Sequence, residues 1–455
     1  MTVPTAAAPG SVPAPGTPRL WPLLSTLRSR LGFRFSPGGG SAAALVADGR
    51  GFLFCEYWSL AGDAPGCRVV PGFRLAARAG DDPAALPAEA VPFDDGSVLI
   101  TGRNELRFVS PGGDTWVADG LPFRPQTTAP APDGRHHVLF TGQEDSGAWS
   151  AWYWAAAEKG ARKVAELAGP ALRGGGWLDT GATRYVFNAL PAGGARDGAA
   201  SVPMVLDLAG GGVTPLPIAS PSAHDLAWHT APRTGRVLMA GGQGDERWLW
   251  IAGPDGARRL RAPERLDGSV SPLAMHPDGD LVALVSARGL VQRLVALDVR
   301  TDTVVPLPTP DGTAVGGGAW SDGAPDAAPR MWVLSVSPGR SPRIMSTAAA
   351  GPGAGPAPAP LREVTDGTAA GSYDAWAPSR LERLPGADGR EIEVIVCGHE
   401  DWRTARRIVV CLHGGPVEQW SLKFSLLFQI FADHGLTVLA PNQAGSTGYG
   451  EAFHR

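Results

Sequence analysis

The stretch Met275–Pro308, MHPDGDLVALVSARGLVQRLVALDVRTDTVVPLP, decides the fold. A His-Pro-Asp-Gly turn at 276–279 leads into the apolar run LVALVS, an Arg-Gly turn at 288–289 leads into VQRLVALDV, and an Arg-Thr-Asp turn at 300–302 leads into TVVPLP. Short apolar runs joined by such turns are typical of β-hairpins. With the strand expected before the first turn, the stretch predicts one sheet of four short strands.

The same unit recurs along most of the chain. Its turn glycines are Gly49, Gly96, Gly134, Gly181, Gly235, Gly279 and Gly323. They lie 38 to 54 residues apart, which matches the period of about 40 to 50 residues of propeller blades. Seven units over about 44–367 therefore predict a seven-bladed β-propeller, and hence a mostly β protein.

Large aromatic residues precede several of these turns at one phase of the repeat, namely Trp177, Trp228 and Trp320. Stacked sheets need bulky wedges between them, so we interpret these tryptophans as core residues rather than as a ligand cage. The Asp-Gly pairs are interpreted as turn-forming residues rather than as catalytic carboxylates. The Gly/Pro-rich stretch 351–360 predicts a flexible loop within the last blade.

The N-terminal region differs from the repeats. Residues 1–18 are rich in Pro and Ala, which predicts a disordered tail rather than a signal peptide. Within 19–40, Trp21, Leu24, Leu27 and Leu31 recur at helical spacing, which predicts an amphipathic helix over 19–35 followed by a linker.

Charge and cysteine content exclude several function classes. The net charge of −4 gives no electrostatic basis for binding nucleic acid or an anionic membrane. No apolar run approaches the roughly 18 residues of a membrane span. The four cysteines, Cys55, Cys67, Cys397 and Cys411, lack metal-ligand spacing and are too few for a disulfide framework. We therefore expect no metal, no cofactor and a cytoplasmic location.

The blade period ends after Trp376, and residues 378–455 have a different pattern. RLERLP and REIEVIVCG predict a hairpin, RRIVVCLHGGP a buried strand, VEQWSLKFSLLFQIFADHG an amphipathic helix that ends at Gly435, and LTVLAPN a second buried strand. Hairpin, strand, helix and strand in this order predict the start of an α/β sheet with parallel strands.

Two motifs in this segment carry a family resemblance. His413-Gly414-Gly415-Pro416 follows a strand, and Pro441-Asn442 is followed by Gly445-Ser446-Thr447-Gly448-Tyr449-Gly450. The chain thus resembles the prolyl oligopeptidase family, and most closely its acylaminoacyl-peptidase and dipeptidyl-peptidase-like branches, which place a propeller before an α/β-hydrolase domain. The resemblance implies a serine peptidase acting on short peptides. Ala444 stands where that family usually has an arginine, so the geometry of this loop or its fit to substrate is expected to differ.

A hydrolase of this fold needs backbone N–H groups aimed at the developing oxyanion. Gly414 and Gly415 are the candidates for this role, and Pro416 would fix the turn, although a plain strand-to-helix turn would show the same residues. His413, Gly445, Ser446 and Tyr449 are expected in the active-site loops. We reject His413 as the catalytic base, because the triad of this fold runs Ser, Asp, His along the chain. His434 is expected to cap a helix C-terminus.

The nucleophile elbow G-x-S-x-G is absent from the 455 residues. Ser446 lacks its spacing, so no catalytic Ser, Asp or His is assigned in this chain, and all three are expected after Arg455. The leading hypothesis is a C-terminally truncated serine peptidase that is inactive as it stands, with residues after about 378 sensitive to proteases. The alternatives are a non-catalytic propeller that binds a protein or peptide, and a serine esterase or amidase.

Overall fold

The structure is a computed structural model. It describes residues 20, 28–48, 51–60, 66–76, 89–102, 105–190, 201–217, 225–243, 246–309, 314–322, 329–338, 340–348, 362–364, 376–387, 389–414, 418–449 and 453. The described residues contain eight four-stranded sheets and one α-helix, so the protein is mostly β. They include no helix with the length and hydropathy of a membrane span.

The first seven sheets are antiparallel, and each is built from four strands that are consecutive in the chain. The first three comprise β1 (Arg28–Phe35), β2 (Ser41–Asp48), β3 (Phe52–Ser59) and β4 (Gly66–Ala76); β5 (Glu89–Pro92), β6 (Val98–Thr101), β7 (Glu105–Val109) and β8 (Thr115–Asp119); and β9 (Thr127–Pro130), β10 (His137–Gln143), β11 (Trp149–Ala155) and β12 (Gly160–Leu167). A short 3-10 helix, η3 (Ala156–Glu158), joins β11 to β12.

The next four sheets have the same order. They comprise β13 (Ala171–Trp177), β14 (Arg184–Ala189), β15 (Val202–Asp207) and β16 (Val213–Pro215); β17 (Leu226–Ala231), β18 (Arg236–Gln243), β19 (Glu246–Gly253) and β20 (Gly256–Leu260); β21 (Ser269–Met275), β22 (Leu281–Arg288), β23 (Val291–Asp298) and β24 (Thr303–Leu307); and β25 (Ala314–Ser321), β26 (Arg330–Ser337), β27 (Arg340–Ala348) and β28 (Arg362–Glu363). The 3-10 helix η5 (Pro263–Arg265) follows β20.

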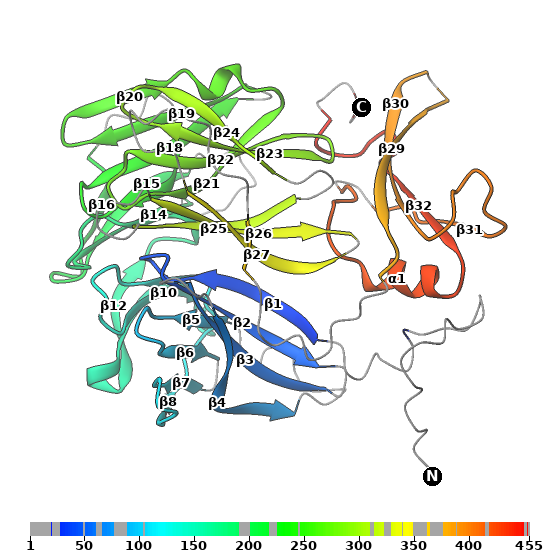
Figure 1. The fold of residues 1–455 in the computed structure, drawn as a ribbon. Coiled ribbons are helices and arrows are strands. Elements are labelled where there is room, and N and C mark those ends of the chain that lie inside the picture. The colour runs from blue at the N-terminus through cyan, green and yellow to red at the C-terminus, as the bar shows by residue number, and fades with distance from the viewer. Residues whose placement is uncertain are drawn as a thin grey trace, which may run out of the picture.

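These sheets, β1 to β28, are called the seven-sheet region below. First strands of successive sheets contact one another, as β13 does β17 and β21 does β25, and β25 contacts β1. The last sheet therefore lies against the first, and Trp58 and Trp332 from these two sheets share one buried cluster. Figure 1 shows this stack of sheets, which is consistent with a β-propeller.

Tryptophans at the ends of first strands pack between the sheets, as predicted. Trp177 and Trp320 are 5% and 2% exposed, whereas Trp228 is only half-buried. The Trp177 indole N–H donates to the carbonyl of Pro130 at 2.8 Å, and that of Trp320 donates to Ala274 at 3.2 Å. Each bond reaches the first strand of the preceding sheet, so these side chains fix the stacking as well as fill the core.

The helix predicted over 19–35 is wrong where the structure describes it. Residues 28–35 form β1, which pairs with β2. The reason is a period of two: Phe33 and Phe35 pack against the cluster that contains Trp58, while the intervening Arg34 donates to the carbonyl of Thr128.

Other predictions for this part of the chain are not tested. Trp21, Leu24 and Leu27, the tail 1–18 and the loop 351–360 lie outside the described residues. The first sheet begins at Arg28, whereas the first predicted blade began near residue 44.

The eighth sheet lies beside the seven-sheet region (Figure 1) and comprises β29 (Ser379–Pro385), β30 (Glu391–Cys397), β31 (Ile408–Val410) and β32 (Thr437–Pro441). Its order is β29-β30-β32-β31, with β31 and β32 parallel. Helix α1 (Leu426–Asp433) connects the two parallel strands. This is the hairpin, strand, helix and strand order expected from the sequence.

Helix α1 is shorter than the predicted helix. It begins only after Ser425, whose hydroxyl accepts from the Phe428 N–H, and ends at His434 with Gly435 next at a φ of +70°. His434 caps it as expected, with Nδ1 2.9 Å from the carbonyl oxygen of Ile430. The preceding residues from Glu418 are irregular.

The aromatic residues around α1 pack in a core. Phe428 is 2% exposed, and Trp420 and Phe431 pack against the same cluster. Leu290 and Ala314 of the seven-sheet region belong to this cluster. The neighbouring sheets thus supply the apolar surface that the short eighth sheet lacks.

Candidate active-site loops

Two loops meet at one edge of the eighth sheet. Because β31 and β32 are parallel, the segments that follow them leave the sheet on the same side. We call residues 411–414 the first loop and residues 442–449 the second loop. The sequence-predicted residues His413, Gly414, Gly445, Ser446 and Tyr449 all lie in these loops.

A histidine–serine contact links the two loops. His413 Nε2 lies 2.7 Å from Ser446 Oγ, and His413 Nδ1 lies 2.8 Å from the carbonyl oxygen of Gly414. Ser446 Oγ also lies 2.7 Å from the carbonyl oxygen of Gln443. A carbonyl oxygen only accepts, so Nδ1 carries a proton and donates it to Gly414.

This contact does not form a nucleophile–base pair of the triad type. Ser446 is fully buried, and its hydroxyl is held by Gln443 within its own turn. The Nδ1 atom of His413 faces a backbone carbonyl rather than the carboxylate that orients a catalytic imidazole. The geometry therefore supports a structural role for both residues.

The backbone of the first loop is only partly described. Gly414 is exposed, whereas Gly415 and Pro416 lie outside the described residues. The oxyanion role of Gly414 and Gly415 stays a prediction. In the second loop, Gly445 has a φ of +95°, a backbone conformation that favours glycine.

The sequence interpretation missed a buried polar group beneath the second loop. Glu393, in the middle of β30, is 7% exposed, and its Oε2 accepts a hydrogen bond from the Tyr449 hydroxyl at 2.9 Å. Burial is the main cause that raises the pKa of Tyr449 above its usual value, so this phenol stays protonated and donates. The available signal was a carboxylate inside the apolar run EIEVIV, which a solvent-facing position also explains.

A cavity of about 440 Å³ adjoins this carboxylate between the eighth sheet and the sheet β21 to β24. Its lining is strongly charged and comprises Asp267, Ser286, Arg288, Gly289, Val291, Arg293, Arg383, Glu391, Glu393 and Tyr449. Arginines and carboxylates are equal in number in this lining, so it carries no net formal charge.

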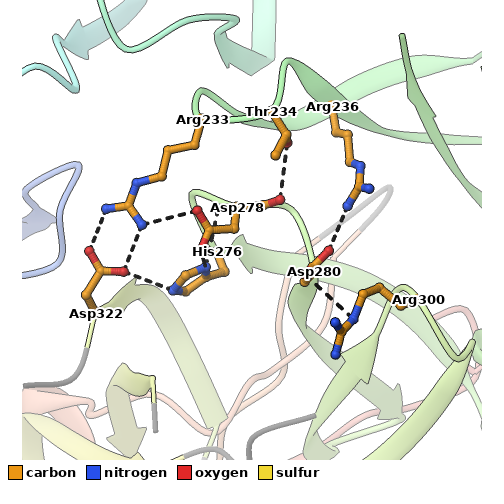
Figure 2. Close-up of polar contacts among 8 residues, drawn as sticks. All are labelled: Arg233, Thr234, Arg236, His276, Asp278, Asp280, Arg300 and Asp322. Carbon is orange, nitrogen blue, oxygen red and sulfur yellow. Dashed lines mark hydrogen bonds and ion pairs between the residues drawn. The ribbon is translucent and has the colours of Figure 1, made fainter. Parts of the chain in front are cut away.

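A second polar cluster joins three sheets of the seven-sheet region (Figure 2). Arg233 donates to Asp278 at 3.2 Å and to Asp322 at 2.9 Å, and His276 Nε2 lies 3.3 Å from Asp322. In the described part of the chain, His276, Asp278 and Asp322 are the one group of three residues spaced to hold a metal ion. The Arg233 guanidinium already lies between the two carboxylates and supplies the positive charge, so we interpret the cluster as an ion-pair network between sheets.

The chain is similar to known proteins over a short stretch of its sequence and over most of its fold. No family model matches the chain. Over 83 residues, 17% of this chain, it is 31% identical to dipeptidyl-peptidase 5 of Schizosaccharomyces pombe, and the match spans 12% of that protein.

Solved structures match over nearly the whole chain. An acylaminoacyl peptidase of Pyrococcus horikoshii matches with a TM-score of 0.65 and 13% identity, over 94% of this chain and 67% of that protein. A puromycin-hydrolyzing peptidase of Mycobacterium tuberculosis matches with a TM-score of 0.61 and 16% identity, over 95% of this chain and 69% of that protein. The chain therefore spans about two thirds of the length of these structures.

The chain shares its fold, several four-stranded sheets beside a smaller mixed sheet, with these solved structures. A prolyl endopeptidase is a further match, with a TM-score of 0.61 and 13% identity over 95% of this chain and 63% of that protein. The resemblance to the prolyl oligopeptidase family, inferred from the two loop motifs, is thereby confirmed.

Proposed function

We propose that residues 1–455 supply the propeller and the first strands of the catalytic domain of a serine peptidase that acts on short peptides. In this proposal the seven antiparallel sheets are seven blades, and the eighth sheet is the beginning of an α/β-hydrolase sheet. The nucleophile, acid and base would come from sequence outside residues 1–455.

One observation carries the proposal, and it is the arrangement of the two loops. The order β29-β30-β32-β31 brings the ends of two parallel strands to one edge, where ligands bind in open α/β sheets. The motif with candidate oxyanion donors follows one strand, and the glycine-rich loop follows the other. The second loop contacts the β22–β23 hairpin of the seven-sheet region, and that region would restrict access to small or unfolded substrates.

The open edge of the sheet supports the same proposal. Within the described part of the chain, strand β31 pairs on one side only; Ile408 and Val410 in it are 43% and 57% exposed, and Leu412 just after it is 65% exposed. An apolar parallel strand is normally covered on both faces and paired on both edges. A further parallel strand at this edge is where the nucleophile elbow is expected.

The experiment is to express this chain with and without the coding sequence that follows codon 455. We expect the longer protein to hydrolyse acetylated or dipeptidyl fluorogenic substrates and to react with a fluorophosphonate at a single serine outside 1–455. The chain 1–455 is expected to do neither. Labelling of Ser446, or a stop codon directly after 455 in the native gene, would instead favour the non-catalytic alternative or a different nucleophile.

Activity of the longer protein also tests the oxyanion prediction. Gly415→Val is expected to lower kcat by about a hundredfold or more with little change in KM, since loss of one oxyanion donor typically has this effect. Gly212→Val is the matched control, because Gly212 is exposed between β15 and β16, is not at positive φ, and has open space where a Cβ atom would lie. Unchanged turnover in a folded Gly415→Val protein would remove this loop from the mechanism.

A further inference from the structure

The hairpin between β22 and β23 touches the second loop directly. The N–H of Gly289 donates to the carbonyl of Gly448 at 3.2 Å, and the N–H of Leu290 donates to Glu393 Oε2 at 2.7 Å. Gly289 has a φ of +58°, and a Cβ atom at this position would clash with both Glu393 and Tyr449. The contact is therefore so close that only glycine fits.

Glu393 connects the hairpin to the second loop through hydrogen bonds. Its Oε2 atom accepts from Leu290 of the seven-sheet region and from the Tyr449 hydroxyl of the second loop, so one oxygen joins the two parts. The Tyr449 hydroxyl in turn accepts from Asn442 Nδ2 at 2.8 Å. Asn442 is fully buried, and its backbone N–H donates to the Glu393 carbonyl at 2.8 Å.

Asn442 continues the network to the first loop. Its Oδ1 accepts from the Trp420 N–H at 2.8 Å, and its Nδ2 donates to the Trp420 carbonyl at 3.2 Å. The Trp420 indole N–H donates to the Cys411 carbonyl at 2.8 Å, and its ring lies edge-on to that of His413. An unbroken series of hydrogen bonds thus runs from the hairpin to the residues before Gly414.

We propose that Glu393 and Tyr449 are positioning residues through which the Gly289–Leu290 hairpin holds both candidate active-site loops in place. An effect of these residues on catalysis rests on the proposed function, whereas their effect on the positions of the two loops does not. A buried, fully bonded polar network has discrete geometry, and removing one member leaves other buried groups unpaired. Loss of the hairpin contact should therefore loosen the loops at a distance, including residues that the hairpin never touches.

The first test measures amide hydrogen exchange in the chain 1–455, which needs no activity. Gly289→Ala is expected to raise exchange in 411–414 and 442–449 by about tenfold or more, because the added methyl group separates the hairpin from Glu393. Gly147→Ala is the control, since Gly147 is also at positive φ, +85°, in a hairpin turn with open space around it. Unchanged exchange in both loops of a folded Gly289→Ala chain would overturn the proposal.

The second test removes single hydrogen-bonding groups from the network. Tyr449→Phe removes only the hydroxyl, and Glu393→Ala removes the acceptor; both are expected to raise exchange in the first loop. Glu393→Gln retains a carbonyl oxygen and should restore protection, a rescue that a role of charge alone would not give. Glu391→Gln, on the same strand and bordering the same cavity, is the matched control and should change nothing.

The third test uses the longer protein with its catalytic residues. If it is active, Tyr449→Phe and Glu393→Ala should lower kcat by about tenfold or more with KM nearly constant, as expected for misplaced transition-state contacts. Glu393→Gln should again recover most of the rate. If the longer protein is inactive, the proposed function fails while the exchange result stands; altered exchange with unchanged kcat would remove the positioning role.

Discussion

The seven-sheet region and the eighth sheet differ in what covers their apolar residues. Each of the first seven sheets packs against neighbours of its own kind, and the last lies against the first. The eighth sheet has an exposed edge at β31 and shares a core with Leu290 and Ala314 of the seven-sheet region. In the repeat, neighbouring sheets cover one another, whereas the four-stranded mixed sheet shares its core with residues of the seven-sheet region.

The largest effect that tests this comparison comes from two identical substitutions. Leu284 in β22 is fully buried, whereas Leu412 beyond β31 is 65% exposed. Leu284→Ala is expected to lower the free energy of unfolding by about 2–5 kcal/mol through lost burial and a cavity. Leu412→Ala is expected to stay within about 0.5 kcal/mol.

Urea unfolding followed by tryptophan fluorescence measures both variants. A large loss for Leu412→Ala would mean that the edge of β31 is covered in solution, by a second copy or by another segment. Sedimentation of the wild-type chain at two concentrations then separates these two explanations. Equal effects of the two substitutions would break the comparison altogether.

The junction between the two parts should show a smaller, local effect. Gln429 of α1 is 2% exposed, donates to the Pro338 carbonyl at 3.1 Å and accepts from the Ala377 N–H at 2.7 Å. Gln429→Ala leaves these backbone groups buried without a partner, at about 1–3 kcal/mol. We expect faster proteolysis after residue 376 with the seven-sheet region intact.

Limited proteolysis with mass spectrometry checks this, and Lys423→Ala, at an exposed position before the same helix, is the control. The same experiment on the wild-type chain tests the prediction that residues after about 378 are cleaved first. If Gln429→Ala and wild type give the same cleavage rates and sites, the junction does not hold the eighth sheet in place.

The sequence was sufficient for features that arise within one repeat. The turn at 276–279 precedes β22 as predicted, and the turn predicted at 288–289 lies one residue later, at Gly289 and Leu290, because the signals for a hairpin are local. The order of elements in the eighth sheet was likewise predictable from short apolar runs with different flanking residues. The family resemblance needed only the two loop motifs.

Features set by distant contacts were not predictable. Arg28–Phe35 was assigned to a helix because a few leucines matched helical spacing, yet pairing with β2 decides its conformation. The start of α1 is different: it is set by the local Ser425 cap, a signal that the sequence interpretation did not use, rather than by the apolar residues before it. Glu393 gave no usable signal, because its partners Leu290 and Tyr449 are 103 and 56 residues away.

The smallest expected effect concerns His276 in the ion-pair network that joins three sheets of the seven-sheet region. This residue is 4% exposed, and burial is the main cause that lowers its pKa below 6.5, while Asp278 and Asp322 oppose that shift and Arg233 adds to it. Asp280, the next acidic residue on the same turn, pairs with Arg236 at 2.7 Å and also raises the His276 pKa. The folded chain therefore binds this proton less readily than the unfolded chain.

That difference fixes the sign of the pH dependence. Where the unfolded state binds more protons, stability rises with pH. The contribution of His276 is complete above about pH 6.5, and it is lost as the pH falls from there towards the lowered pKa of the folded state. Its slope is at most about 1.4 kcal/mol per pH unit. Urea unfolding at a series of pH values measures it: His276→Asn should flatten the curve below pH 6.5 relative to wild type. A curve for His276→Asn as steep as that of wild type would show that folding does not disfavour protonation of His276. The ion-pair network around Arg233 would then contribute to packing without any pH dependence.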